Sequence, residues 1–299
     1  MTILVSGSTG LVGSAIVTRL EEEGHRVVRL VRREPESDRS EVGWNPESGA
    51  IDTSGLKGTD AVIHLAGDNI AEGRWNNQKK ARIRDSRVNG TRLLAESLAD
   101  LDAPPRTLIA ASAIGYYGDR GDEVLTEEST PASDFLSETC QAWEAAVQPA
   151  IQKGIRTVNL RIGVVLSLDG GALAKMHFPF RMGVGGVMGS GDQYVSWVSI
   201  HDLPGIVLHL LSNEDLSGPV NSVAPNPVTN REFTKTLGRV LVRPTLFPMP
   251  AFAARLAFGE MADALLLSST RVQPERLVAS GYAFRHPDIE PALREILEK

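Results

Sequence analysis

The sequence predicts an α/β protein of the Rossmann type, in which a doubly wound parallel sheet is joined to a smaller C-terminal domain. Short apolar runs alternate with helical stretches through the first half of the chain, which is the pattern of βαβ units. The first apolar run leads directly into a cluster of glycines at residues 7–13. After Leu166 the alternation weakens, and glycine and proline become frequent.

The elements of the first half follow from the spacing of apolar residues. Residues 2–6 form a short apolar run before the glycine cluster, as a buried strand does. Apolar side chains then recur every three to four positions from Leu11 to Leu20, and Gly24 can end that helix. Ser133 or Asp134 can cap a later helix. We expect strands at residues 2–6, 27–31, 61–65, 107–111 and 157–166, and helices at 11–23, 79–100 and 135–153.

The second half is predicted to be less regular. Residues 170–191 are rich in glycine and lack periodicity, and their stretch 183–191 is either a flexible lid or an irregular connector. Residues 194–200 and 220–223 resemble strands, and 201–211 a helix. We place the first domain at residues 1–166 and expect residues from about 195 to 224 to rejoin it. Residues 167–299 are assigned to a smaller, loop-rich and helical domain on the substrate side.

Composition and charge argue against several classes of protein. Hydrophobic residues make up 42% and charged residues 23%, as in a soluble globule. The net charge of −6 disfavours a nucleic-acid binder, and no run approaches the ~18 apolar residues of a membrane span. The single cysteine permits no intrachain disulfide, and the six histidines lack metal-ligand spacing. With no signal-peptide pattern, we expect a cytoplasmic monomer or homodimer that binds a small molecule and no metal, membrane or nucleic acid.

The glycine cluster has the spacing of a dinucleotide-binding turn. Glycine permits a tight turn, lets the backbone approach a pyrophosphate, and lets the following helix pack closely on the strand. The N-terminus of that helix then faces the phosphates. The alternative is a plain glycine turn, but the position between a strand and an amphipathic helix favours the cofactor. The residues predicted to bind the cofactor here are Gly7, Ser8, Thr9, Gly10, Leu11, Val12 and Gly13.

Two arginines close the second predicted strand and indicate which cofactor binds. Arg32 stands nineteen residues after Gly13, and neither Asp nor Glu occurs between Val27 and Arg33. A carboxylate at this place suits the ribose 2′-hydroxyl of NAD, whereas arginine suits the 2′-phosphate of NADP. Arg32 and Arg33 therefore predict NADP(H), and the alternative is a pair of exposed charges at a strand end.

Several blocks of the chain resemble one protein family. His64-Leu65-Ala66-Gly67 is similar to the strand end that borders the cofactor in extended short-chain dehydrogenase/reductases, so Leu65, Ala66 and Gly67 are implied to bind it. Further blocks resemble an atypical subgroup, the epimerase family or nucleoside-diphosphate-sugar epimerase-like proteins, which has its own C-terminal domain of unknown function. These blocks are RWNNQKKARIRDSRVNGT (74–91), SAIGYYGD (112–119), DFLSETCQAWEAA (134–146), LRIGVVLSLDGGALAKM (160–176), SWVSIHDL (196–203), NSVAPNPVTNREF (221–233) and GEMADALLLSSTRVQPERL (259–277).

The resemblance also implies where catalytic residues belong. Members of the superfamily use a serine, together with a tyrosine followed four residues later by a lysine whose charge favours the phenolate. Ser112 fits the serine. In DFLSETC the tyrosine position falls on Phe135 or Leu136, and the lysine position on Thr139 or Cys140. The tyrosine–lysine pair is therefore absent.

Other side chains can replace this pair or line the pocket. We expect Tyr117 at the cleft beside Ser112, where it can move a proton. Arg161 can approach a phosphate of the cofactor or form an ordinary ion pair. For the aromatic residues the alternative to substrate contact is packing. The aromatic residues predicted to contact the substrate are Tyr116, Trp75 and Trp197.

Four further residues have open roles. Cys140 can be a nucleophile, but no histidine is placed to activate it, so a buried core residue is favoured. Glu138 or Glu144 can act as a base, although Glu144 resembles a packing or salt-bridge residue. Arg87 stands in Arg-Val-Asn-Gly-Thr, where extended relatives show asparagine.

The sequence thus predicts an NADP(H)-binding, epimerase-like oxidoreductase that acts on a small carbonyl or nucleotide-sugar-like compound. The absent pair keeps a second hypothesis open, a non-catalytic NADP-binding protein with a regulatory or cell-division-associated role.

Overall fold

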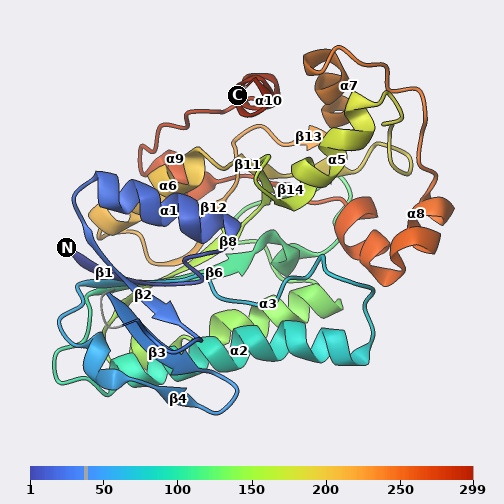
Figure 1. Ribbon diagram of the computed structural model, residues 1–299. Coiled ribbons are helices and arrows are strands. Elements are labelled where there is room, and N and C mark those ends of the chain that lie inside the picture. Colours follow the sequence, from blue (N-terminus) through green and yellow to red (C-terminus); the bar gives the residue numbers. More distant parts are fainter. Residues whose placement is uncertain (37–39, 299) are drawn as a thin grey trace.

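The centre of the molecule is a mostly parallel sheet (Figure 1). The computed structural model describes residues 1–36 and 40–298, and in this part of the chain the sheet has eight strands, in the order β12-β8-β6-β5-β1-β2-β3-β4. All neighbours run parallel except β3 and β4. The strands are β1 (Thr2–Ser6), β2 (Arg26–Val31), β3 (Glu41–Asn45), β4 (Ala50–Ile51), β5 (Ala61–His64), β6 (Thr107–Ala113), β8 (Arg156–Ile162) and β12 (Gly218–Ser222).

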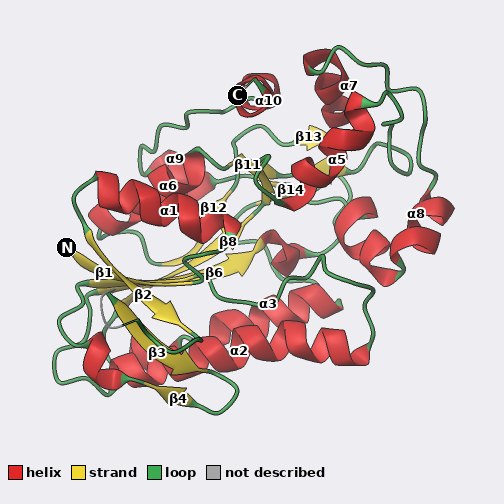
Figure 2. Cartoon of the chain, in the orientation of Figure 1, coloured by secondary structure: helices red, strands yellow, loops and turns green. Residues whose placement is uncertain are grey.

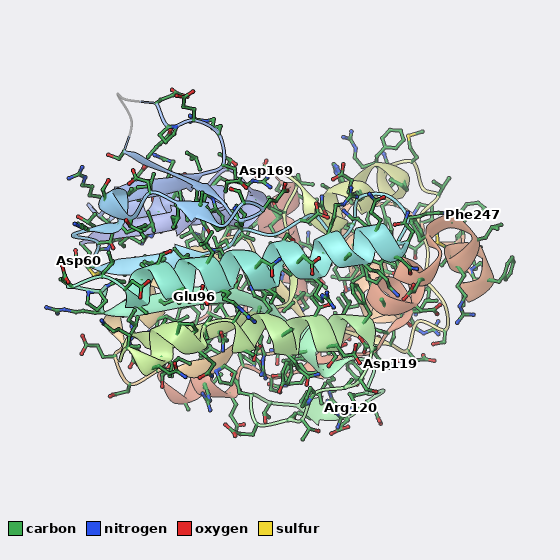
Figure 3. All side chains as sticks on the ribbon, turned by 90° about the horizontal axis from the view of Figure 1, so that it is seen from below. Asp60, Glu96, Asp119, Arg120, Asp169 and Phe247 are labelled. Atoms are coloured by element: carbon green, nitrogen blue, oxygen red, sulfur yellow. The ribbon has the colours of Figure 1, made fainter. Side chains whose placement is uncertain are left out.

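Helices cover both faces of this sheet, as in a doubly wound fold (Figure 2). On one face α1 (Leu11–Glu22) and α6 (Asp202–Ser212) pack against Ile3 and Val5. On the other, α2 (Asn77–Ala99) and α4 (Gln148–Gln152) pack against Leu4, because side chains alternate along a strand. Figure 3 shows α2 and α3 (Phe135–Ala145) side by side on this second face.

The strands and helices expected in the first half are present, with two errors and one omission. The strand expected at 157–166 is two strands, β8 in the main sheet and β9 (Val164–Leu166), which pairs with β11 (Trp197–Ser199) outside it. The helix predicted at 135–153 is two helices, which separate at Ala146 and Val147. Pro149 causes the break, because it stands in the first turn of α4 and has no backbone N–H to continue the α3 pattern. The strands β3 and β4 were not predicted, because their apolar runs are short.

The C-terminal half forms a second layer over the carboxyl ends of the strands (Figure 1). The glycine-rich residues expected to be irregular begin with a helix, α5 (Gly171–Arg181). β12 rejoins the main sheet beside β8, as expected for residues near 220. The remaining elements are η1 (Thr53–Leu56), η2 (Ile114–Tyr117), β7 (Val124–Leu125), β9 (Val164–Leu166), β10 (Tyr194–Val195), β11 (Trp197–Ser199), β13 (Val228–Thr229), α7 (Asn230–Val240), α8 (Ala251–Phe258), η3 (Ala262–Leu267), β14 (Arg271–Val272), α9 (Glu275–Ala279) and α10 (Ile289–Leu297).

None of the helices in the described residues is both long enough and apolar enough to span a membrane.

Candidate functional site

The glycine turn connects β1 to α1 and leaves no room for larger residues. Gly7 has a φ of +65°, and the amide of Gly10 donates to the Gly7 carbonyl at 3.0 Å. A Cβ on Gly13 would lie 2.1 Å from the Gly7 carbonyl oxygen, so only glycine lets α1 pack this closely. No side chain in the described residues caps α1, and its first turn has no acidic residue. No side chain therefore occupies the N–H groups at the start of α1, and such groups suit an anion.

The two arginines at the end of β2 differ in their surroundings. Arg33 is fixed, because its Nη2 lies 2.6 Å from Oε1 of Glu41 and 3.1 Å from Oε1 of Glu36. Arg32 is exposed and forms no hydrogen bond or ion pair with the described residues. Glu41, on β3, braces Arg33 with a side chain that is only 2% exposed. In the described part of the chain, Arg32 is thus the available cation at this strand end, and Glu41 is a supporting residue that sequence analysis missed.

A cavity of about 680 Å³ extends from the glycine turn to the C-terminal layer. Val12 and Leu65 line its cofactor end, and residues 111–115 at the end of β6 form its wall. The C-terminal layer closes it with residues 260 and 263–266. Trp75 lines it too, held by a 2.8 Å hydrogen bond from its Nε1 to the Ile70 carbonyl.

The helix face that lacks the tyrosine–lysine pair lines this cavity. The four residues at the aligned positions all contribute to it, and none has a phenol or an amine. Burial raises the pKa of the Cys140 thiol to about 12, so the thiol stays neutral and fits the favoured core role. Glu138 is exposed and lies outside the cavity lining. The four positions are Phe135, Leu136, Thr139 and Cys140.

A buried ionic network supports the cavity wall. The guanidinium of Arg161 binds both carboxylate oxygens of Glu144 at 2.8 Å, and Oγ of Ser112 donates to Oε1 of Glu144 at 2.6 Å. Arg161 also donates to the Tyr117 hydroxyl at 2.9 Å, and that hydroxyl donates to Asn221 at 2.7 Å. Ser112 is the member of this network that lines the cavity.

Two predicted site residues do not reach the cavity. Tyr117 was expected at the cleft, but the η2 turn directs its ring into the core, where it is fully buried and burial raises its pKa to about 12. Trp197 was expected against the substrate, but it is fully buried beside Phe180 and donates to the Asn226 carbonyl. Their direction depends on tertiary packing, which the local sequence does not encode.

Arg161 and Tyr116 also lie outside the cavity lining. Arg161 is 2% exposed and forms the ordinary ion pair that was the alternative to a phosphate contact. The ring of Tyr116 lies over its guanidinium, with 3.5 Å between the ring centre and Cζ. Both residues therefore support the wall from behind.

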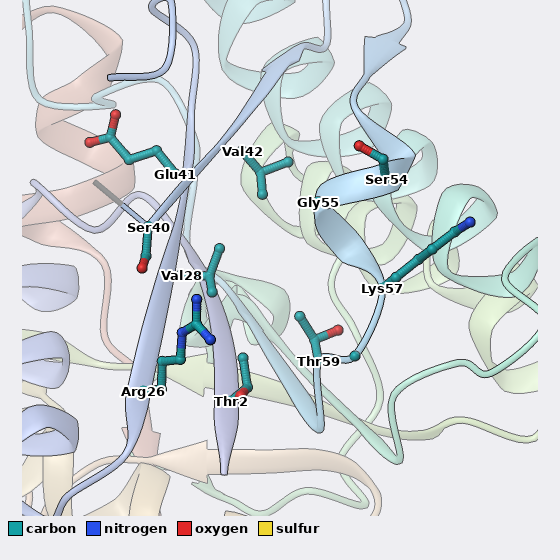
Figure 4. A pocket seen from close by; sticks show the side chains of 11 residues that line it. Thr2, Arg26, Val28, Ser40, Glu41, Val42, Ser54, Gly55, Lys57 and Thr59 are labelled. Carbon is teal, nitrogen blue, oxygen red and sulfur yellow. The ribbon is translucent and has the colours of Figure 1, made fainter. Parts of the chain in front are cut away.

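A second hollow opens at the opposite edge of the sheet (Figure 4). Thr2 and Arg26, the first residues of β1 and β2, line it together with the η1 residues Ser54 and Gly55. Ligands of doubly wound sheets bind at the carboxyl ends of the strands. We therefore assign the functional site to the cavity at the glycine turn.

Comparison with known proteins agrees with this geometry. The model of the NAD dependent epimerase/dehydratase family matches residues 3–223. The chain belongs to this family. A second model, a domain of unknown function (DUF1731), matches residues 249–296 of the epimerase-family chain. The combination confirms the resemblance to the atypical subgroup with its own C-terminal domain.

The relatives of this epimerase-family protein span its whole length. Epimerase family protein Mb2239 of Mycobacterium bovis is 45% identical over 291 residues, which cover 97% of this chain and 96% of the relative. The crystal structure of human epimerase family protein SDR39U1 with NADPH has a TM-score of 0.93 and 36% identity, covering 100% of both chains. A nucleoside-diphosphate sugar epimerase from Corynebacterium glutamicum has a TM-score of 0.82 and 38% identity, and the match covers 99% of this chain and 58% of that one.

Proposed function

We propose that this protein binds NADP(H) and exchanges hydride between it and a small carbonyl or hydroxyl compound in the cavity. The residues fit the cofactor: Gly13 leaves room at the turn, the free N–H groups of α1 suit a pyrophosphate, and Arg32 suits a 2′-phosphate. When bound, the nicotinamide supplies the hydride. The human relative crystallised with NADPH supports this choice.

The observation that carries the proposal is the cavity that continues beyond the glycine turn. A volume of about 680 Å³ can hold the nicotinamide end of the cofactor and a small second molecule. Among the described residues that line it, Arg87 is the one cation. The acidic residues of the lining are Asp119, Asp134, Glu260 and Asp263.

This charge balance favours a small neutral substrate over a nucleotide sugar. A diphosphate in the cavity would meet four carboxylates and one guanidinium, and like charges repel. Two of the carboxylates are paired, Glu260 with Lys80 and Asp263 with Arg255, which leaves two carboxylates and one guanidinium and so a net charge of −1 on the lining. The substrate we infer is therefore an uncharged carbonyl compound or its alcohol.

Ser112 is the residue proposed to contact the reacting oxygen. Its hydroxyl proton is directed to Glu144, so its oxygen can accept a hydrogen bond from a substrate hydroxyl. Turned away from Glu144, the same hydroxyl can donate to a substrate carbonyl and give its proton to the alkoxide that hydride transfer forms, and Ser112 then regains a proton from solvent. Arg161 holds Glu144 in place through two hydrogen bonds, and Tyr117 holds Arg161. Tyr117 thus acts as a positioning residue and does not need to reach the substrate.

The test is to mix the protein with NADPH and a panel of small aldehydes and ketones and to follow the loss of nicotinamide absorbance. We expect turnover that falls roughly 100-fold in Ser112→Ala, the range for lost proton handling, while NADPH binding persists. Tyr117→Phe should instead lower thermal stability, because Asn221 and Arg161 lose a buried partner. Turnover that survives in Ser112→Ala would contradict the assigned role.

A second function is favoured by the missing tyrosine–lysine pair. A protein without a proton donor of that kind can bind NADP(H) as a regulatory or cell-division-associated protein without catalysis. Tight NADPH binding with no turnover across the whole panel would support this second function and overturn the first.

A further inference from the structure

Arg87 is a half-buried cation that the proposed chemistry leaves unused. It lies on α2 and lines the cavity. Its Nη1 donates to the Ile83 carbonyl at 3.0 Å, and its Cζ lies 5.1 Å from the centre of the Trp143 ring. Within the described residues it forms no ion pair and no other hydrogen bond. Burial lowers its pKa, yet a guanidinium remains charged in proteins.

The guanidinium lines the floor of the cavity, which is the part between Gly67, which follows β5, and Trp143 on α3. A Cβ on Gly67 would come within 3.2 Å of Cζ of Arg87, so the glycine there leaves room for this side chain. On the other side it contacts the ring of Trp143 on α3, the helix that carries Cys140, and Arg87 and Cys140 both line the cavity. Cys140 is one of the two positions at which the superfamily lysine was expected. A cation therefore stands at this floor, supplied by α2 in place of α3.

The fold places the two ends of the cofactor on opposite sides of β1. A dinucleotide crosses the carboxyl edge of such a sheet at the point where the strand order reverses. Arg32, at the end of β2, lies on the adenosine side. Gly67 follows β5, and the cavity wall at residues 111–113 ends β6, so Arg87 lies on the nicotinamide side.

We propose that Arg87 binds the ribose next to the nicotinamide of NADP(H) through its free N–H groups. Arg87, on α2, thereby provides the positive charge that the superfamily lysine would provide from α3. This inference rests on the proposed cofactor, and it adds a binding residue for the half of the cofactor that Arg32 and the glycine turn do not reach.

The test uses fragments of the cofactor to show which half of it Arg87 binds. Calorimetry would measure the binding of NADPH, of 2′-phospho-ADP-ribose, which keeps the second ribose, and of adenosine 2′,5′-bisphosphate, which lacks it. We expect Arg87→Gln to weaken the first two by roughly 10- to 100-fold, the range for hydrogen bonds from a charged donor. The third should bind as it does to the wild type, which also shows that the variant is folded.

Two further variants control for a merely structural role. Arg87→Lys retains a cation and should restore NADPH binding to within a few-fold of the wild type. Arg84→Gln removes an exposed arginine one turn earlier on α2 and should change none of the three affinities.

Several results would overturn the inference. Unchanged NADPH binding in Arg87→Gln would do so, and so would equal weakening of all three ligands that Arg87→Lys does not repair. Equal weakening of all three that Arg87→Lys does repair would also overturn it, because the third ligand has no second ribose. Failure of the proposed function is a separate result, seen in the wild type as no NADPH binding or no turnover.

Discussion

At the scale of single residues, the two arginines after β2 differ in their ion-pair partners, and we expect them to contribute unequally to cofactor choice. Glu41 and Glu36 hold Arg33 in place, whereas Arg32 has no ion-pair partner among the described residues. A cation without a partner breaks no ion pair when it turns to a phosphate, whereas Arg33 must keep or exchange its carboxylates. Arg32 is therefore expected to contribute most to the choice between NADP(H) and NAD(H).

Arg32→Ala is predicted to weaken NADPH binding by roughly 10- to 100-fold, the range for hydrogen bonds to a charged group. NADH binding should change less than threefold, because NADH has no 2′-phosphate. Titration calorimetry of both nucleotides measures the difference.

The matched control for this prediction is Arg26→Ala, which removes an exposed arginine from the opposite end of the same strand. Its affinities should equal those of the wild type. Equal losses of NADPH and NADH in Arg32→Ala would show that Arg32 does not bind the 2′-phosphate.

The buried His64 predicts a pH dependence of stability. Oγ of Ser6 accepts from two backbone amides, so its own proton is donated to Nδ1 of His64 at 2.7 Å. Burial lowers the pKa of His64 to about 4. His64 has an ordinary pKa of 6.5 in the unfolded state. As the pH falls below 6.5, the unfolded state therefore binds a proton on His64 while the folded state does not, and the free energy of unfolding decreases.

Between pH 7 and pH 4 the wild type should lose roughly 3 kcal/mol of unfolding free energy beyond the loss in His64→Gln. The amide of glutamine fills the site and does not titrate. Urea unfolding at a series of pH values gives both curves, and parallel curves would contradict the assignment.

The sequence predicted the local motifs correctly, but it did not predict whether a given side chain points into the cavity or into the core. The glycine turn and Arg32 follow from short-range spacing. Tyr117 and Trp197 were placed in the cleft, but η2 and the β11 packing turn them into the core. Glu41 lies beside Arg33 because β3 pairs with β2, and the local sequence does not predict this pairing.

At the scale of elements, the turn between β1 and α1 depends on the third glycine of its motif. Gly13→Ala would set a methyl group 2.1 Å from the Gly7 carbonyl oxygen, so α1 must move away from the strand. We predict a loss of stability of roughly 1–3 kcal/mol, as for overpacking, together with at least tenfold weaker NADPH binding.

Gly24→Ala is the control that separates the steric clash at Gly13 from the backbone strain of replacing a glycine elsewhere. Gly24 has a φ of +76°, but a methyl group there would meet nothing within 4 Å, so its cost is backbone strain alone. Thermal unfolding should show a loss of about 1 kcal/mol for Gly24→Ala, with NADPH binding intact. Weakened binding in both variants would contradict a specific role for the turn.

Elements with strong periodicity were predictable, and their ends were less so. The helix at 135–153 was expected as one because its apolar spacing continues, but a proline near its end divides it. α5 was missed because glycines surround it, although its apolar residues pack on β9 and the core near Leu173. For α5, tertiary contacts outweighed the local signal.

At the scale of the whole molecule, the C-terminal segment pairs with and packs against elements of the first domain. β14 pairs with β7, and Oγ of Ser196 both donates to the Thr270 carbonyl and accepts from the Val272 amide. Leu277 is buried in the same core as β1 and α1. The two regions matched by separate family models therefore share one core.

A chain that ends at residue 248 is predicted not to fold cooperatively. It would lose Leu277 and β14, and it would expose the cavity lining. Differential scanning calorimetry and circular dichroism of the truncated chain measure this, with the full chain as the control. A cooperative transition with NADPH bound by the truncated chain would show that the first domain is independent.

The guanidinium beside Cys140 also constrains how this protein can change by mutation. Cys140→Lys would place a lysine at one of the two positions where the superfamily lysine falls, yet it would bring a second positive charge to the cavity that Arg87 already lines. A lysine at this position is therefore expected to be better tolerated when Arg87 is replaced by an uncharged residue.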